Sequence, residues 1–389
     1  MNEVYGSFEI DRAPGADLKK YRELGGLWGR LIVKMIIEPS TPGPLSCPSL
    51  DPTPIFEMVR WSFGTELLAA AVAHFDLFSL LSDRALTFDQ ISRELGLAPR
   101  AANVLLVALR AMGLLMADSA GKLAPSALAG EYLVPGGAFY MGDYVRLISE
   151  SPGVKNIVQR LRSNKPTESR PDDPGAAFIF REGLESAMDH ESSARRLTLA
   201  LAGRARIVGP VVAKAFPAGN AKKLLDVGGG SGLYSIALLA ANPSLRAVVW
   251  DSEQVLKVAR EMAQKHGVID RMEFCPGDMF ADPVPGDCDV ILLSNVLHDW
   301  DVPECEILLK RCAAALAPGG QLLIHDVFLN DELDGPLPVA LYSAALFNIT
   351  EGRAYSAAEY RRMLAAAGLR AGQITPTLVH CGILEATRE

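Results

Sequence analysis

A short run of small residues marks the place where this sequence could bind a ligand. Residues 224–235 read Leu-Leu-Asp-Val-Gly-Gly-Gly-Ser-Gly-Leu-Tyr-Ser, an apolar run closed by an acid and several glycines. This pattern predicts a buried parallel strand that turns sharply into a helix. Glycines allow backbone torsions closed to other residues and leave room for a ligand against the main chain. Asp226, Gly228 and Gly230 are therefore candidate binding residues.

The spacing of the glycines shows which kind of nucleotide-binding loop this segment resembles. A dinucleotide fingerprint needs G-x-G-x-x-G. Here the glycines at 228, 230 and 232 give G-x-G-x-G, and Leu233 stands where the last glycine would be. No Gly-Lys-Ser/Thr follows, which excludes a P-loop. The spacing is typical of S-adenosylmethionine (SAM) pockets, where the loop accommodates an amino acid and a ribose.

Acids stand where the next two strands should end. Asp251 closes the second apolar run, where a carboxylate can accept hydrogen bonds from both hydroxyls of a ribose. Asp278 follows the third run and can accept from an adenine amino group, while Met279 and Phe280 flank the ring. Each acid alone could be an ordinary helix N-cap. Their order along successive strand ends favours one cofactor site.

A histidine follows the fourth predicted strand and could carry out proton transfer. The strand 288–294 runs into Asn-Val-Leu-His-Asp-Trp, which places His298 at the same edge of the sheet. An imidazole titrates near neutrality and can act as a general base. The alternative is a histidine that only packs or caps there. His325 beside Asp326 raises the question of a metal site, but two histidines without ligand spacing predict none.

These residues need a sheet that brings strand ends together. Apolar runs that alternate with helical segments from residue 223 onward predict a doubly wound, Rossmann-like α/β domain. In such sheets ligands bind beyond the carboxyl ends of the strands, at the topological switch point. The strands are expected at 223–227, 246–250, 271–275, 288–294, 320–326, 369–374 and 379–385.

The preceding half of the chain is predicted to be helical. Residues 87–113 have the spacing of a helix-turn-helix, and 114–124 could form a wing. The second helix, 101–112, is nearly all apolar and offers almost nothing to phosphates or base edges, which favours an internal or dimer-forming role. We expect four parts: an extension with one amphipathic helix and a Pro-rich linker (1–53), an all-α winged-helix dimerisation domain (54–132), a helical linker that lines the substrate (133–215) and a catalytic α/β domain (216–389).

Composition limits the partners. The 389 residues are 49% hydrophobic and 22% charged, as in a globular protein without membrane spans. The net charge of −8 argues against nucleic acid or an anionic membrane as the main partner. Six scattered cysteines show no metal-binding or disulfide spacing, and Glu3 and Glu9 with no early apolar core lead us to expect no signal peptide. We expect a cytoplasmic protein.

The motifs together resemble a known family. The segments 224–232, 277–280, 297–300 and 318–320, with Asp251, are similar to those of SAM-dependent O-methyltransferases of the caffeic-acid and hydroxyindole type. The resemblance covers about residues 54–386. Bacterial members of that family act on polyketides, phenazines and other secondary metabolites. The resemblance implies a homodimer in which one subunit helps to line the pocket of its partner.

The resemblance also implies roles for single residues. His298 would be the general base, and Asp326 aligns with an acid that flanks that base and can orient its imidazole. Ser294 joins the cofactor-binding residues, with SAM as methyl donor and S-adenosylhomocysteine (SAH) as product. Independently of the resemblance, the residue types of Phe139, Tyr140 and Met141 make them candidate substrate contacts, with packing in the core as the alternative, and Asn348 is a further candidate.

One position departs from the family pattern. The family usually has a second glutamate after the fifth strand, and here Ala354 occupies that position, with Glu351 three residues earlier. We expect methyl transfer to a hydroxyl of a mid-sized aromatic or polyketide-like metabolite. The departure leaves open a C-methyltransferase or a SAM-binding relative that catalyses decarboxylation, hydroxylation or cyclisation. A winged-helix regulator that senses SAM is a further alternative.

Overall fold

The computed structural model describes residues 45–166 and 187–388. Of the two units into which the chain divides, all described residues belong to the second, Pro44–Glu389. The amphipathic helix expected in the extension 1–53, and part of the expected linker 133–215, lie outside the described residues. Among the helices in the described ranges, none has both the length and the apolar character that crossing a bilayer requires.

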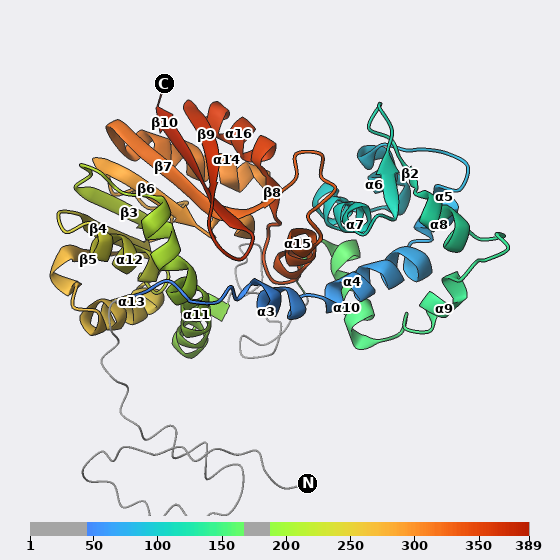
Figure 1. Cartoon of the computed structure of the whole chain (residues 1–389), viewed down its shortest axis with the longest axis horizontal. Helices are drawn as coiled ribbons and strands as arrows, with labels where there is room; N and C mark the ends of the chain where they lie inside the picture. The colour runs from blue at the N-terminus through green and yellow to red at the C-terminus, as the bar shows by residue number, and fades with distance from the viewer. Residues whose placement is uncertain (1–44, 167–186, 389) are drawn as a thin grey trace, which may run out of the picture. The chain divides into compact units, whose positions relative to one another are not determined.

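The centre of the second unit is a mostly parallel sheet with the strand order β5-β4-β3-β6-β7-β10-β9 (Figure 1). The first five strands in this order are parallel, and β10 is antiparallel to both of its neighbours. The chain order reverses between β3 and β6, which is the switch point expected of a ligand site. The expected α/β sheet is thus confirmed. Its strands are β3 (Lys223–Val227), β4 (Arg246–Asp251), β5 (Met272–Pro276), β6 (Cys288–Ser294), β7 (Leu316–Leu329), β9 (Leu369–Pro376) and β10 (Cys381–Arg388), and β8 (Tyr355–Ser356) pairs with β7.

Helices cover both faces of this sheet because its strands are apolar on both sides. Leu224 packs into one buried cluster and its neighbour Leu225 into another, as expected where successive side chains of a strand point in opposite directions. One cluster contains α11 (Glu191–Ala215), α12 (Leu233–Ala241) and α13 (Glu253–Lys265). The other contains α14 (Val302–Ala315) and α16 (Ala357–Ala366).

The amino-terminal half of the unit is a group of short helices with one small hairpin. Thr87 and Gln90 form a capping box that starts α6 (Phe88–Leu95), and a turn then leads into α7 (Pro99–Ala111). The strands β1 (Leu115–Ala117) and β2 (Leu123–Pro125) follow as an antiparallel pair. The remaining helices are α3 (Thr53–Met58), α4 (Ser62–Ala69) with the π-turn Ala70–His74, α5 (Leu77–Leu80), α8 (Ala127–Tyr132), α9 (Gly142–Arg146) and α10 (Pro152–Ser163).

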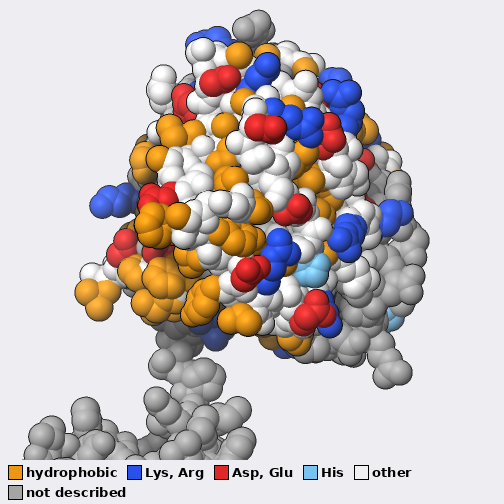
Figure 2. All heavy atoms as spheres, turned by 90° about the vertical axis from the view of Figure 1, so that its right-hand side faces the viewer, with side chains coloured by type: hydrophobic (Ala, Val, Ile, Leu, Met, Phe, Trp, Pro, Cys, Tyr) orange, Lys and Arg blue, Asp and Glu red, His pale blue; other side chains and the backbone are white. Residues whose placement is uncertain are grey.

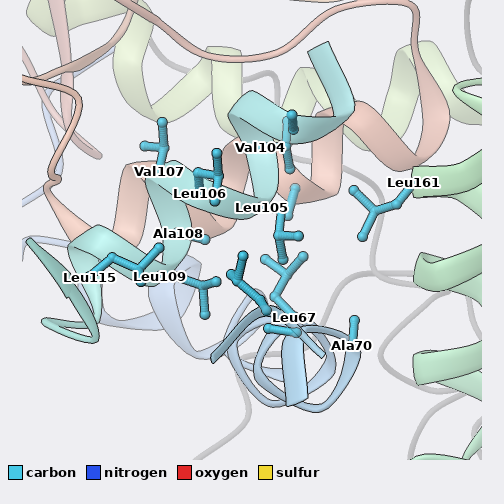
Figure 3. Packing of buried hydrophobic residues seen from close by; sticks show 14 of the residues in the cluster. Leu67, Ala70, Val104, Leu105, Leu106, Val107, Ala108, Leu109, Leu115 and Leu161 are labelled. Carbon is cyan, nitrogen blue, oxygen red and sulfur yellow. The ribbon is translucent and has the colours of Figure 1, made fainter. Parts of the chain in front are cut away.

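Helix α7 lies at the centre of this half. All residues from Val104 to Leu109 are buried, and Leu105 and Leu109 lie on the side of α7 that faces Leu67 of α4 (Figure 3). A DNA-recognition helix must expose one face to the groove. Since α7 is enclosed by its neighbours, it forms the core of the helical part and cannot read a base sequence.

Helix α15 (Leu337–Ile349) joins the two halves. It follows β7 in the chain, yet it packs against α7, and its residues Val339, Ala344 and Phe347 belong to the core of the helical part. Arg160 of α10 is fully buried at the end of α15. Its Nε and one terminal nitrogen donate to the carbonyl oxygens of Phe347 and Thr350, both at 2.6 Å. A cation there satisfies carbonyl groups that the helix leaves free.

We expect the Arg160→Met substitution to destabilise the fold by about 2–4 kcal/mol, because it removes two hydrogen bonds from a charged group and leaves two buried carbonyls without a donor. Urea unfolding followed by circular dichroism would measure the loss. Arg362→Met is a suitable control, since Arg362 is exposed on α16. Equal stability of the two variants would show that Arg160 does not secure α15.

Candidate active site

The glycine loop after β3 is covered closely by residues from two other strands. Gly228, Gly230 and Gly232 all have a positive φ, between 59° and 71°, which L-residues with side chains rarely adopt. A Cβ atom on Gly228 would lie 3.0 Å from Val296, just beyond β6, and 3.4 Å from Met279, beyond β5. Three strand ends therefore converge on this loop, as the sequence predicts.

Two of the predicted acids contact the loop in different ways. Asp226 is buried and accepts a hydrogen bond from Ser235 Oγ at 2.6 Å, so its carboxylate holds the first turn of α12. Burial raises the pKa of Asp226 to about 7. Asp251 accepts from the backbone amides of Gly230 at 2.9 Å and Ser252 at 2.7 Å. Burial raises the pKa of Asp251 to about 6.

The residues around the loop fit a nucleoside. Each oxygen of Asp251 accepts one backbone hydrogen bond, and a carboxylate offers about four acceptor positions, so two remain for a pair of ribose hydroxyls. Asp278 is exposed and accepts from the amide of Phe280 at 2.8 Å. The Phe280 ring packs edge-on against Trp300, with centroids 4.6 Å apart. Asp251 and the Phe280 ring thus offer a polar and an apolar surface near the loop.

His298 lies in a short 3₁₀ turn, Leu297–Asp299, beyond the end of β6. Its side chain is buried, and Nδ1 is 2.6 Å from Oδ1 of Asp326. Asp326 lies within β7, which continues to Leu329, and not at the end of the strand as the sequence suggested. The same carboxylate accepts from the amide of Val327 at 2.8 Å and from the Tyr360 hydroxyl at 3.0 Å. The predicted histidine and acid therefore form a buried, oriented pair.

Charge controls the protonation of this pair. Burial alone lowers the pKa of His298, but the carboxylates of Asp326 and Asp299 outweigh it and hold that pKa above its ordinary value. Burial raises the pKa of Asp326, and His298 more than reverses this, so the net pKa is lowered. Asp299 lies 3.7 Å from Nε2 of His298, and burial raises its pKa to about 7. Because Nδ1 is bonded to Asp326, Nε2 is the nitrogen left to exchange a proton with a substrate.

Residues 351–354, which include the position that departs from the family pattern, pack against the backbone of the turn that carries His298. A Cβ atom on Gly352 would collide with the carbonyl oxygen of His298, so only glycine fits there. Glu351 donates its backbone amide to the carbonyl oxygen of Asp299 at 3.1 Å. Ala354 is fully buried and donates its amide to Ser343 Oγ at 3.0 Å. The segment therefore supports the turn that carries His298 through its main chain.

A second histidine lies beside the pair. The ring of His325 is 2.8 Å from Ser294 Oγ at Nδ1 and 3.1 Å from Thr377 Oγ1 at Nε2. Burial lowers the pKa of His325 to about 3, so this imidazole is neutral. Ser294, a predicted cofactor residue, is thus placed in the His325 network. Sequence reasoning considered His325 only as a metal ligand, because its hydrogen-bond partners lie on other strands and loops.

Three other residues near the pair were missed. Tyr342 of α15 meets the His298 ring edge-on, with centroids 5.7 Å apart. Tyr234 of α12 meets the His325 ring at 5.3 Å. Arg204 of α11 lies near both tyrosines and is 3.4 Å from the Tyr342 hydroxyl. No spacing in the sequence marks these residues, since they come from three different helices.

The expected substrate residues lie in two places. Phe139 and Met141, on the segment between α8 and α9, are 64% and 41% exposed in this single chain. Tyr140 precedes Met141 on that segment. Asn348 lies on α15 and accepts from the side-chain amide of Asn156 at 3.0 Å. These positions do not bring the four residues together beside His298 in one chain.

Comparisons with known proteins point to one family. The family model described as an O-methyltransferase domain matches residues 177–370. The chain is 32% identical to the 3-hydroxy-5-methyl-1-naphthoate 3-O-methyltransferase of Streptomyces sahachiroi, over 82% of this chain and 89% of that protein. A crystal structure of an O-methyltransferase family 2 protein from Planctomyces limnophilus in complex with apigenin is 43% identical. It superposes with a TM-score of 0.80 over 89% of this chain and 98% of that one.

A more distant structure contains the methyl donor. Human N-acetylserotonin methyltransferase in complex with SAM is 23% identical and has a TM-score of 0.54 over 88% of this chain and 99% of that one. At this identity the likeness shows a shared fold.

We expect Asp326→Asn to lower the pKa of His298, because the amide removes both the negative charge and the charged hydrogen bond that raise it. The imidazole resonances followed by NMR during a pH titration would report the change. His74, which lies in the helical part, serves as an internal reference. An unchanged or raised pKa of His298 would show that Asp326 does not set its protonation.

Proposed function

This chain belongs to the O-methyltransferase family, which makes it a SAM-dependent enzyme, and on that premise we propose that it methylates a hydroxyl of a mid-sized aromatic or polyketide-like metabolite with His298 as general base. The observation that carries the proposal is the buried 2.6 Å hydrogen bond between Asp326 and His298, which follows by two residues the Val296 that packs against the glycine loop. The aromatic substrate class is supported by the naphthoate in the name of the Streptomyces enzyme and the apigenin bound to the Planctomyces protein.

The cofactor site would be formed by the glycine loop, with Asp251 toward the ribose and Met279, Phe280 and Asp278 toward the adenine. When bound there, SAM supplies a methyl group on a sulfonium whose departing thioether is neutral, so no general acid is needed. The remaining tasks of the protein are positioning and removal of one proton.

His298 would remove that proton through Nε2. Asp326 holds Nδ1 and stays ionised, so it fixes the orientation of the ring and stabilises the imidazolium that forms. Tyr360 and the amide of Val327 hold the carboxylate in turn. Because its pKa is raised, the neutral imidazole of His298 is a stronger base than an ordinary histidine. At a pH below that pKa, however, a smaller fraction of the imidazole is neutral.

We further propose a homodimer formed through a winged-helix domain. The helix-turn-helix α6–α7 followed by the β1–β2 hairpin supports the winged-helix assignment. Large apolar side chains are exposed at both ends of the helical part, and Figure 2 shows such side chains gathered on one of its faces. Helix α3 and the turn after it expose Ile55, Met58, Val59 and Trp61 by 61–76%, and the α9 region exposes Tyr144 and Leu147 by 71% and 77%. A partner subunit would cover these side chains and could receive Phe139 and Met141.

His298→Ala should lower kcat by about 10²–10⁴, the usual contribution of a general base. In the native enzyme the rate should rise with pH through a pKa above the ordinary histidine value, because only neutral imidazole accepts a proton. This rise should be absent from the variant. Transfer of labelled methyl from SAM to a panel of hydroxyaryl acceptors at several pH values would measure both effects.

The matched control is Asp251→Ala. It should weaken SAM binding by about 1.5–3 kcal/mol, the size of hydrogen bonds to a charged group, while His298→Ala leaves that affinity unchanged in calorimetry. If the His298→Ala enzyme kept the native kcat and pH profile, His298 would not be the general base and its role would be structural.

The dimer should be visible in light scattering at micromolar concentration. The double substitution Val59→Glu and Trp61→Glu should weaken it, since it places charges on exposed apolar positions. Leu50→Glu, at another exposed position outside α3, is the control. A native protein that scatters as a monomer would contradict the proposed assembly.

A further inference from the structure

Two arginines close to the His298 pair form no ion pair with a carboxylate of the described residues. Arg60, between α3 and α4, is only 9% exposed. Arg204, on α11, donates to the sulfur of Cys381 at 2.9 Å, and its Nε atom is buried without a hydrogen-bond partner. Among residues 45–166 and 187–388, no carboxylate forms an ion pair with either guanidinium. Arginine stays charged at any physiological pH.

Both cations contact the aromatic ring that also contacts His298. The guanidinium carbon of Arg60 lies 3.6 Å from the ring centroid of Tyr342, and that of Arg204 lies 5.6 Å from it. The His298 ring meets the same tyrosine at 5.7 Å. In Figure 1, α3 lies between α11, which crosses a face of the sheet, and α15. The arginines therefore belong to the surroundings of the proposed reaction centre.

The neighbouring groups do not neutralise these charges. Burial raises the pKa of the Cys381 thiol and of the Tyr342 hydroxyl, so both groups are neutral. Two carboxylates act on the arginines through their charge, Glu57 on Arg60 and Asp326 on Arg204, but each is already paired with a histidine, His380 and His298 respectively. A cation shielded from water is costly unless carbonyl oxygens compensate it, as they do for Arg160, or a ligand supplies the opposite charge. Arg60 is buried and Arg204 is partly exposed, and within residues 45–166 and 187–388 neither guanidinium donates to a carbonyl oxygen. Two such cations in contact with one ring make a site for an anion.

We infer that the acceptor carries a carboxylate and that Arg60 and Arg204 bind it, so the substrate class is an aromatic hydroxy acid. This inference rests on the proposed function for the role of His298. Guanidinium groups bind carboxylates through paired hydrogen bonds, and Arg204 still has an unused buried donor. Because the arginines and the imidazole contact one tyrosine ring, the carboxylate and the reacting hydroxyl fit on a single small aromatic molecule.

A competing role for the arginines is stabilisation of the phenolate of a neutral acceptor. It would make the arginines necessary for every acceptor, whereas a carboxylate site makes them necessary only for acids. Matched acids and amides of the same shape separate the two roles.

The test uses the full-length protein loaded with SAH, with hydroxybenzoate and hydroxynaphthoate isomers and their carboxamides as probes in calorimetry. We expect at least one acid to bind tenfold or more tightly than its amide. Arg60→Gln and Arg204→Gln should each weaken binding of that acid by about 10- to 100-fold and leave the amide unchanged. Arg204→Lys, which keeps the charge, should recover part of the loss. Arg362→Gln, at an exposed position on α16, should behave as the native protein.

Equal affinity of the native protein for acids and amides, or no binding of any acid at millimolar concentration, overturns the inference. So does an equal loss of acid and amide binding in variants that retain native SAH affinity. Methyl transfer is measured separately. A clear acid preference in binding without transfer to any hydroxyl would refute the proposed function alone, while transfer with equal kcat/KM for acids and amides would refute the carboxylate site alone.

Discussion

The short hydrogen bond between His298 and Asp326 is the interaction on which the rest of the site depends. It joins a turn after β6 to the middle of β7, so its length requires that these two strands be adjacent and in register. Ser294 pairs with His325 in that register, which places Asp326 one residue further along β7. The close approach of Gly352 to the carbonyl oxygen of His298 then holds the turn that carries this histidine in position. A buried ion pair is costly unless all of its groups form hydrogen bonds. Here the Tyr360 hydroxyl and the Val327 amide donate further hydrogen bonds to the Asp326 carboxylate.

The neighbouring histidines illustrate how the surroundings set protonation. His298 and His325 are both buried, yet the pKa of His298 is raised and that of His325 falls to about 3. Burial disfavours the charged form of both rings. His298 differs because a carboxylate bonds directly to its ring, whereas the ring of His325 is bonded to two hydroxyls. His298 can therefore bind a proton at a higher pH than an ordinary histidine, while His325 stays neutral.

Helix α15 connects the fold to the site. Its residues Val339, Ala344 and Phe347 complete the core around α7, and Tyr342 on the same helix meets the His298 ring. The helical half is thus more than a support for assembly, because it holds one wall of the site through the bonds of Arg160 to the end of α15. Loss of the Arg160 hydrogen bonds would therefore also displace Tyr342 and its contacts with Arg60 and Arg204.

The sequence alone predicted the strands of a doubly wound α/β sheet and the residues that follow several of them, whereas the order of the strands within the sheet came from the structure. Buried strands, the glycine loop and Asp251 are local patterns whose period and chemistry can be read along the chain. The pairing of His298 with Asp326 was available only through resemblance, since 28 residues separate them. Tertiary structure decided that Asp226 faces Ser235, that Asp299 lies near Nε2, and that α15 belongs to the helical core. It alone brought Arg60, Arg204 and Tyr342 together, because contacts between helices far apart in sequence depend on packing and leave no periodic signal.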